Sequence, residues 1–258
     1  MDKYTGFSSS YEKFMDNIPY DKWTEYIVSL LKQHNVNDGL VCELGCGTGS
    51  ITRRLSKAGY DMIGIDSSMD MLEVAMYDHM DENNGILYLN QDMREMELYG
   101  TVNAFVCVCD GMNYLLEDED LIKTFRLVNN YLEAGGLFIF DMKTEYEYSV
   151  RMGNRTMVDD REDGTLIWEN RYDPETKENR YDITVYDLIS DEEGLYERSD
   201  ETHIQKAYDP GHVKELIESA GLEFVAMYDA FTMNSPKEDS ERIYFIAKEK
   251  RQEGKLYV

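Results

Sequence analysis

The sequence predicts an α/β fold: a doubly wound, mostly parallel sheet of seven strands, with an antiparallel β-meander inserted after the fifth strand. The parallel sheet is indicated by short apolar runs that alternate with amphipathic helical segments. The insertion is indicated by a change of period. Residues 146–208 alternate between apolar and polar positions and carry turn signals such as Asp173-Pro174 and Glu193-Gly194.

The division of the chain follows from this change of period. We expect residues 1–145 and 209–258 to form one ligand-binding domain, with a helical lid over residues 1–38. Residues 146–208 form the insertion, and their many charged side chains predict a solvated outer face. The insertion could be structural only, could close over a substrate, or could pair its strand edges with a second subunit. A homo-oligomer therefore stays an open alternative.

The segment before the first strand is rich in aromatic residues. Residues 8–34 place aromatic and aliphatic side chains at helical spacing, which predicts one or two helices. These helices could simply cap the sheet, because aromatic stripes are mostly core. Alternatively, Tyr11, Tyr20 and Trp23 close over a bound ligand.

The central stretch of the chain is residues 40–49, LVCELGCGTG. A strand buried on both faces leads into a glycine turn, and a helix follows. A dinucleotide-binding GxGxxG turn does not match, because Gly49 comes one residue early. The Gly-Lys-Ser/Thr ending of a phosphate-binding loop is absent. The pattern that matches is apolar, apolar, acidic, any residue and then GxGxG, with Glu43, Gly45, Gly47 and Gly49 at its fixed positions.

This pattern resembles motif I of the class I S-adenosylmethionine-dependent methyltransferases. The resemblance implies that S-adenosylmethionine binds against the turn, with contacts from Glu43, Gly45, Cys46, Gly47 and Gly49. The cofactor carries no phosphate and therefore needs no lysine. Its amino group and sulfonium favour a nearby carboxylate such as Glu43.

The ends of the next two strands extend the resemblance. The second strand ends at Asp66, where a carboxylate can accept hydrogen bonds from both hydroxyls of a ribose, and Ser67 follows it. The third strand is expected to end at Asp92. In the resembled family this acid accepts the adenine amino group and the next amide, here Met93, donates to the ring. We assign Gln91 to the same site.

The exit of the fourth strand carries the candidates for acceptor contacts. Asp110, Asn113 and Tyr114, arranged D-x-x-N-Y, can orient a nucleophile or stabilise its charge, although Tyr114 could equally be a packing residue. Cys109 and Asp110 are also expected to contact the cofactor. His203, on the last strand of the insertion, could be a general base near neutral pH or a structural histidine.

Two segments resemble a bacterial branch of small-molecule methyltransferases, and a third resembles the wider family. The order Y-E-x-F followed by P-Y-x-x-W, which contains Tyr11, Tyr20 and Trp23, is similar to the N-terminal lid of that branch. The D-x-x-N-Y segment resembles the same branch, and L-x-A-G-G-x-F-x-F-D, over residues 132–141, resembles the family's motif after the long helix. A helix over residues 209–221 and two final strands would complete the sheet, the last strand running antiparallel.

Composition limits the partners. Among 258 residues, Asp and Glu outnumber Lys and Arg by 52 to 26, and the formal charge of −26 repels nucleic acids and anionic membranes. The start lacks a signal-peptide pattern and no apolar run reaches the length of a membrane span, so we expect a cytoplasmic protein. The four cysteines form no C-x-x-C pair, so we expect reduced packing residues and no metal site.

We therefore expect methyl transfer to a nucleophilic N, O or S atom of a small-molecule acceptor. The cofactor carries the reactivity, and the protein mainly aligns the two reactants. Three alternatives remain. A cofactor-binding protein without transferase activity would bind S-adenosylmethionine but use no acceptor. An NAD-linked dehydrogenase is disfavoured by the glycine spacing, and a tRNA-modifying methyltransferase by the acidity of the chain.

Overall fold

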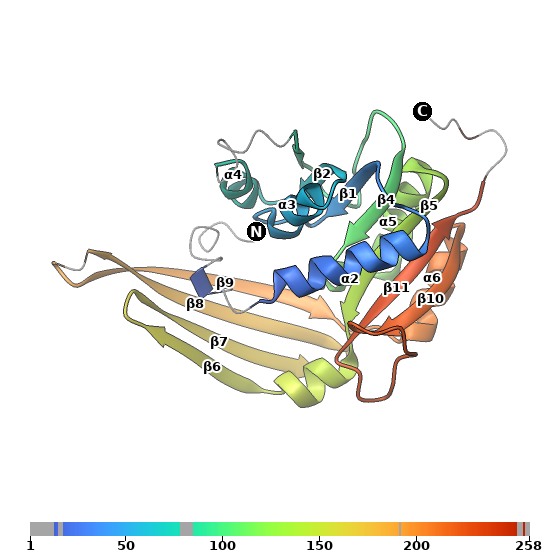
Figure 1. Cartoon of the computed structure of the whole chain (residues 1–258). Coiled ribbons are helices and arrows are strands. Elements are labelled where there is room, and N and C mark those ends of the chain that lie inside the picture. Colours follow the sequence, from blue (N-terminus) through green and yellow to red (C-terminus); the bar gives the residue numbers. More distant parts are fainter. Residues whose placement is uncertain (1–12, 15–17, 78–84, 191, 252–254, 256–258) are drawn as a thin grey trace.

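The computed structural model describes residues 13–14, 18–77, 85–190, 192–251 and 255. Tyr11 lies outside the described residues. Two sheets dominate the structure: a main sheet covered by helices, and a second sheet that projects away from it (Figure 1). No helix in the described ranges is long and apolar enough to cross a membrane.

The main sheet has seven strands in the order β10-β11-β5-β4-β1-β2-β3. The strands from β1 to β5 pair in parallel, and β11 pairs antiparallel with both of its neighbours. The predicted sheet is therefore confirmed. The strand order reverses between β1 and β4, and open α/β sheets bind ligands outside the carboxyl ends of the strands at such a switch point. The strands are β1 Leu40–Leu44, β2 Asp61–Asp66, β3 Leu87–Asn90, β4 Val102–Cys107, β5 Leu132–Lys143, β10 Leu222–Asp229 and β11 Arg242–Glu249.

Helices cover both faces of the main sheet. On one face, Leu30 and Ile51 from α2 and α3 share a core cluster with Val41 of β1. On the other face, Phe125 and Ile217 from α5 and α6 share a cluster with strand residues that include Phe105 and Phe138. The sheet is thus buried on both sides, as the continuous apolar runs of its strands require. The helices are α2 Tyr20–Gln33, α3 Ser50–Lys57, α4 Met69–Tyr77, α5 Asp118–Tyr131 and α6 Pro210–Ser219.

The second sheet is the predicted antiparallel meander after β5. It has four strands in chain order, preceded by the short helix η2 (Glu147–Met152). Tyr148, Tyr181 and Ile183 belong to the small core on its inner face. The end of β9 returns to the main sheet beside the exit of β4 (Figure 1). The strands are β6 Arg155–Arg161, β7 Gly164–Asp173, β8 Glu178–Ser190 and β9 Leu195–Lys206.

One strand is shorter than predicted. We expected the third strand to reach Asp92, but β3 ends at Asn90. The chain turns there because the carbonyl of Asp92 accepts a hydrogen bond of 2.9 Å from the Glu95 amide, and its side chain accepts one of 2.8 Å from the Arg94 amide. Asp92 therefore belongs to a loop and not to a strand end.

Candidate active site

The glycine turn joins β1 to α3 and is fastened to β2. Gly45, Gly47 and Gly49 all have positive φ, at 68°, 52° and 76°, which non-glycine residues adopt only with strain. The Gly47 amide donates a hydrogen bond of 2.8 Å to Oδ2 of Asp66. A Cβ added at Gly47 would meet no described atom within 4 Å. The backbone is therefore open to a ligand at that position, as a cofactor cradle requires.

Asp66, half-buried at the carboxyl end of β2, is aligned by three backbone groups. Besides Gly47, the Ser68 amide donates a hydrogen bond of 2.8 Å to Oδ1, and the backbone of Ser67 also bonds the carboxylate. Burial raises the pKa of Asp66, and these backbone hydrogen bonds oppose the rise. A carboxylate offers about four acceptor sites, so Asp66 can still accept a hydrogen bond from a ribose. Ser67 is exposed next to it.

Glu43 and Cys46 lie deeper than the turn itself. The Thr52 hydroxyl donates a hydrogen bond to Oε2 of Glu43, and burial raises the pKa of this carboxyl to about 8. Burial thus favours the neutral acid of Glu43, and the carboxylate that we expected from the sequence stays a prediction. Cys46 is buried, with its Sγ 2.9 Å from where a Cβ at Gly64 would lie, and burial raises the pKa of its thiol.

The predicted adenine-binding segment is organised by Arg94. Its Nε and Nη2 donate to the Asp92 carboxylate at 3.0 and 2.6 Å, and Nη1 donates to Asp120 at 3.0 Å. The Arg94 guanidinium lowers the pKa of Asp92. The Gln91 side chain stabilises the loop through Glu97. Its Oε1 accepts a hydrogen bond of 2.8 Å from the Glu97 amide, and its Nε2 donates one of 3.3 Å to the Glu97 carbonyl. An adenine amino group would therefore meet an Asp92 carboxylate that is already paired.

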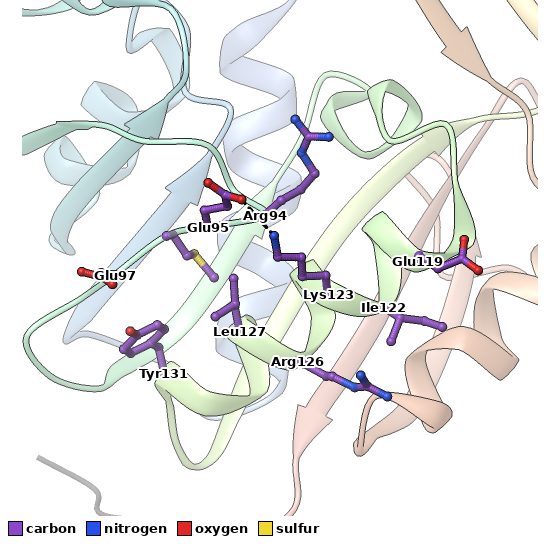
Figure 2. Close-up of a pocket in the computed structure, with 10 residues that line it drawn as sticks. Arg94, Glu95, Glu97, Glu119, Ile122, Lys123, Arg126, Leu127 and Tyr131 are labelled. Atoms are coloured by element: carbon purple, nitrogen blue, oxygen red, sulfur yellow. Dashed lines mark hydrogen bonds and ion pairs between the residues drawn. The ribbon is translucent and has the colours of Figure 1, made fainter.

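Arg94 also lines a cavity of about 600 Å³ on the outer side of this loop. Figure 2 shows Arg94 and Glu95 on the loop side and Lys123 and Leu127 on the α5 side of this cavity. Met93, in contrast, turns toward the glycine turn: its Cε lies 3.6 Å from where a Cβ at Gly45 would be. The contact that we predicted from the sequence is made by the Met93 backbone amide, and it stays a prediction.

The turn after β4 is strained. Cys109 and Asp110 are consecutive non-glycine residues with φ of 61° and 58°. Such residues cost of order 1–3 kcal/mol each and persist where the surroundings enforce them. Burial raises the pKa of the Cys109 thiol, which keeps it protonated.

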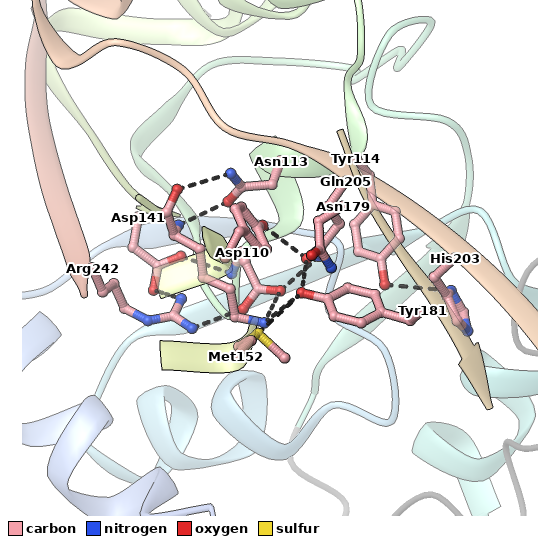
Figure 3. A network of polar contacts seen from close by, with 12 residues as sticks. Asp110, Asn113, Tyr114, Asp141, Met152, Asn179, Tyr181, His203, Gln205 and Arg242 are labelled. Atoms are coloured by element: carbon pink, nitrogen blue, oxygen red, sulfur yellow. Dashed lines mark hydrogen bonds and ion pairs between the residues drawn. The ribbon is translucent and has the colours of Figure 1, made fainter. Parts of the chain in front are cut away.

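A buried polar network holds this turn (Figure 3). Asp110 accepts hydrogen bonds from Nη2 of Arg242 at 2.8 Å and from Nε2 of Gln205 at 2.6 Å, and Nζ of Lys143 lies 3.1 Å from its carboxylate. Nη1 of Arg242 donates to Asp141 at 2.7 Å, and the Asp110 amide donates to the same carboxylate at 2.8 Å. The network thus joins β4, β5, β9 and β11.

The charges in this network set the proton affinities of its members. Burial alone would raise the pKa of Asp110, but the Lys143 and Arg242 cations outweigh it and lower that pKa. Burial raises the pKa of Asp141. Desolvation would lower the pKa of Lys143, but the Asp110 carboxylate outweighs it and raises that pKa. Asp110 is therefore a weak base, and Lys143 stays protonated at neutral pH.

Asn113 has a different environment from the one we expected. Its side chain is buried; Nδ2 donates to the carbonyls of Lys143 and Lys206 at 3.2 and 2.8 Å, and Oδ1 accepts from the Lys143 amide at 2.9 Å. Both N–H groups of the amide are thus used by the backbone of β5 and β9. These contacts correct the expectation of an acceptor contact: Asn113 fastens the exit of β4 to the second sheet.

Tyr114 and His203 do come together. The Tyr114 hydroxyl lies 3.4 Å from Nδ1 of His203, and Nε2 of His203 lies 2.9 Å from Oε2 of Glu201. The side chains of His203 and Glu201 are 2% and 8% exposed, and Tyr114 is half-buried. Tyr114 belongs to the short helix η1 (Gly111–Tyr114), which follows β4 directly.

The two described lid residues point to different places. The Trp23 ring stacks on Arg242, whose guanidinium carbon lies 4.9 Å from the ring centroid, and therefore reaches the polar network. Tyr20 instead lies under Arg54 of α3, at 5.2 Å. Beside Arg242, a cavity of about 420 Å³ lies between the ends of β5 and β10, with Lys143, Glu147 and Asp229 in its lining.

Four residues of this region escaped the sequence analysis, and a fifth was given no role in it. Asp141 is the last residue of the L-x-A-G-G-x-F-x-F-D motif, but the sequence did not indicate its partners. The other four carry no local signal, because they lie on segments whose approach to β4 the sequence does not reveal. They are Lys143, Glu201, Gln205 and Arg242.

The parallel sheet with its switch point, the open glycine turn and the acid that ends β2 together define a class I methyltransferase fold. Comparison with known proteins agrees. Residues 41–136 match the family described as "Methyltransferase domain". The "Putative methyltransferase YqeM" of Bacillus subtilis (strain 168) is 32% identical over 249 residues, which cover 96% of this chain and 98% of that protein. The chain thus belongs to the S-adenosylmethionine-dependent methyltransferases, and S-adenosylmethionine is its cofactor.

Two other comparisons describe the range of similarity. The crystal structure of a S-adenosylmethionine-dependent methyltransferase from Clostridium acetobutylicum ATCC 824 has a TM-score of 0.85 and 26% identity, and the match covers 96% of this chain and 99% of that one. The glycine/sarcosine N-methyltransferase of Aphanothece halophytica is 26% identical over 121 residues, or 46% of this chain and 45% of that protein. The first match spans both sheets of the chain, and the second spans about half of it.

Proposed function

We propose that this methyltransferase acts on a nucleophilic N, O or S atom of a small molecule, at the switch point between β1 and β4. The proposal depends on one observation: two turns that are each held by hydrogen bonds or ion pairs lie at the same edge of the sheet. The glycine turn after β1 is fastened to Asp66 at 2.8 Å, and the strained turn at Asp110 after β4 is fixed by charged partners. A cofactor on the first turn would have its reactive end toward the second.

On the cofactor side, we assign the backbone of Gly45, Gly47 and Gly49 to the floor of the site. Asp66 would bind the ribose hydroxyls through its remaining lone pairs. Asp92 and the Met93 amide would bind adenine, with Arg94 orienting the Asp92 carboxylate. The remaining proposed contacts with the cofactor are Tyr11, Tyr20, Trp23, Glu43, Cys46, Ser67, Gln91, Cys109 and Asp110.

On the acceptor side, the proposed contacts are Asp110, Tyr114 and His203. S-adenosylmethionine, when bound, supplies an electrophilic methyl group whose bond to sulfur breaks as the acceptor bonds to it. The chain's own residues align the acceptor, exclude water and receive a proton where the acceptor brings one. The formal charge of −26 supports a small molecule over a tRNA acceptor.

Calorimetric titration with S-adenosylhomocysteine tests the cofactor assignments. We expect micromolar binding and at least a tenfold weaker affinity in Asp66→Asn, because the neutral amide loses the charge that strengthens bonds to the ribose hydroxyls. Asp61→Asn is the matched control: Asp61 lies at the exposed start of the same strand. Equal affinities in both variants would overturn the assignment of Asp66. Release of S-adenosylhomocysteine from S-adenosylmethionine with small amines, acids and thiols then tests the acceptor class.

A further inference from the structure

Tyr114, His203 and Glu201 form a chain of polar contacts that leads from the exit of β4 into the second sheet. The contacts are 3.4 Å from the Tyr114 hydroxyl to Nδ1 of His203, and 2.9 Å from Nε2 to the Glu201 carboxylate. Figure 3 shows the Tyr114 hydroxyl directed at the His203 ring. The inner two members are buried, and the outer one is half-buried.

The contacts define which ring nitrogen of His203 carries the proton. An ionised carboxylate only accepts hydrogen bonds, so Nε2 of neutral His203 is the N–H that donates to Glu201. Nδ1 then has a lone pair, and the Tyr114 hydroxyl donates to it. A carboxylate behind a histidine fixes the tautomer and stabilises the imidazolium form.

The other groups near His203 are poor proton acceptors. Tyr181 on β8 is the cross-strand partner of His203, and its hydroxyl donates to Gln205 at 2.8 Å. Burial raises the pKa of Tyr181, so its phenol stays neutral. Asp110 is paired with two cations, and Lys143 is already protonated. Among these described neighbours, the lone pair of His203 is the base that remains.

We infer that Glu201 is a positioning residue that holds His203 as the proton acceptor of the reaction, with Tyr114 as the relay. This inference rests on the proposed function and deepens it, because it restricts the acceptor to one that arrives carrying a proton. As the acceptor atom bonds to the methyl carbon and the carbon–sulfur bond breaks, its proton passes to the Tyr114 oxygen. The Tyr114 hydroxyl proton passes to Nδ1 of His203, and the imidazolium pairs with Glu201.

The test is a pH profile of kcat and KM for Glu201→Gln. Turnover is measured as release of S-adenosylhomocysteine with glycine, benzylamine, phenol and 2-mercaptoethanol as acceptors. At neutral pH we expect kcat to fall about 10- to 100-fold, with KM and the affinity for S-adenosylhomocysteine within about threefold of wild type. The deficit shrinks by up to about tenfold for each unit by which the pH rises toward the pKa of the acceptor, since solvent then removes the proton.

Two further variants complete this test, one as a replacement for Glu201→Gln and one as a control. Tyr114→Phe keeps the aromatic ring and is expected to show the same pH-dependent deficit. It replaces Glu201→Gln in the test if that variant fails to fold. Glu197→Gln, on the exposed part of the same strand, is expected to behave as wild type. A deficit that is equal at every pH, or no deficit, would overturn the relay. No release with any of the four acceptors would also overturn it, whereas binding of S-adenosylhomocysteine would leave the proposed cofactor site standing.

Discussion

Gln205 of β9 donates a hydrogen bond of 2.6 Å from Nε2 to Oδ2 of Asp110, and so links the second sheet to the strained turn after β4. The same amide accepts from the hydroxyls of Tyr148 and Tyr181 at 2.9 and 2.8 Å. A single side chain therefore satisfies three buried polar groups that belong to three different elements. The insertion and the edge of the main sheet are thus joined through a polar contact and not only through the chain connections.

Gln205→Leu keeps the approximate volume of the side chain but leaves three buried groups with fewer partners. We expect the free energy of unfolding to fall by about 1–3 kcal/mol, because unpaired buried polar groups keep their desolvation penalty. Urea unfolding followed by circular dichroism measures this change. Tyr148→Phe, which removes only one of the hydroxyls, is the comparison. A loss in Gln205→Leu no larger than that in Tyr148→Phe would contradict the role of Gln205 as the common partner.

Arg242 neutralises two carboxylates at once. Arg242→Met would leave Asp110 and Asp141 buried without the cation that bridges them at 2.8 and 2.7 Å. Breaking a buried pair in this way costs about 3–5 kcal/mol. In the double variant Arg242→Met/Asp141→Asn, the carboxylate that lost its cation is gone and Asp110 keeps Lys143 at 3.1 Å, so we expect part of the stability to return. Strictly additive losses in urea unfolding would argue against this coupling.

Gly47 and Gly49 provide a matched pair within the glycine turn. Alanine at either position adopts a left-handed conformation that costs about 1–2 kcal/mol. At Gly49 the added Cβ would also lie 2.5 Å from the Tyr88 hydroxyl, whereas at Gly47 it would meet no described atom within 4 Å. Gly49→Ala should therefore lower the melting temperature more than Gly47→Ala. Tyr88→Phe should recover part of the difference, and the reverse ranking would show that the turn is packed differently.

Glu43 should make stability depend on pH. Its pKa in the folded protein is about 8, above the ordinary value of 4.5, so folding favours the neutral acid. This contribution is complete below about pH 4.5 and is lost as the pH rises to about 8. Burial raises the pKa of Asp66, Asp141 and Glu147 as well, and these groups act in the same direction.

Glu43→Gln isolates the contribution of this residue. Melting temperatures measured between pH 5 and pH 8 should fall less steeply in the variant than in wild type, because the amide does not ionise. Thr52→Val is the control, since it removes the hydroxyl that donates to Glu43 and leaves the acid in place. Parallel curves for wild type and Glu43→Gln would mean that Glu43 titrates near its ordinary pKa.

The main sheet, the meander, the glycine turn and the position of Asp66 could all be predicted from the sequence. These features depend on short-range patterns: apolar runs, a period of two, and residues that directly follow a strand. The location of Asp92 was less well determined, because the turn that ends β3 is stabilised by a contact between Asp92 and the Arg94 amide. A strand pattern does not record where such a turn begins.

The surroundings of Asp110 could not be predicted from the sequence, because they depend on how distant segments pack. Gln205 and Arg242 reach its carboxylate from 95 and 132 residues further along the chain. The same holds for Asn113, which fastens two strands, and for Glu201, which hydrogen-bonds His203. Sequence periodicity indicates only which face of its own element a side chain occupies. Which residue of another element meets it there depends on how the two sheets pack.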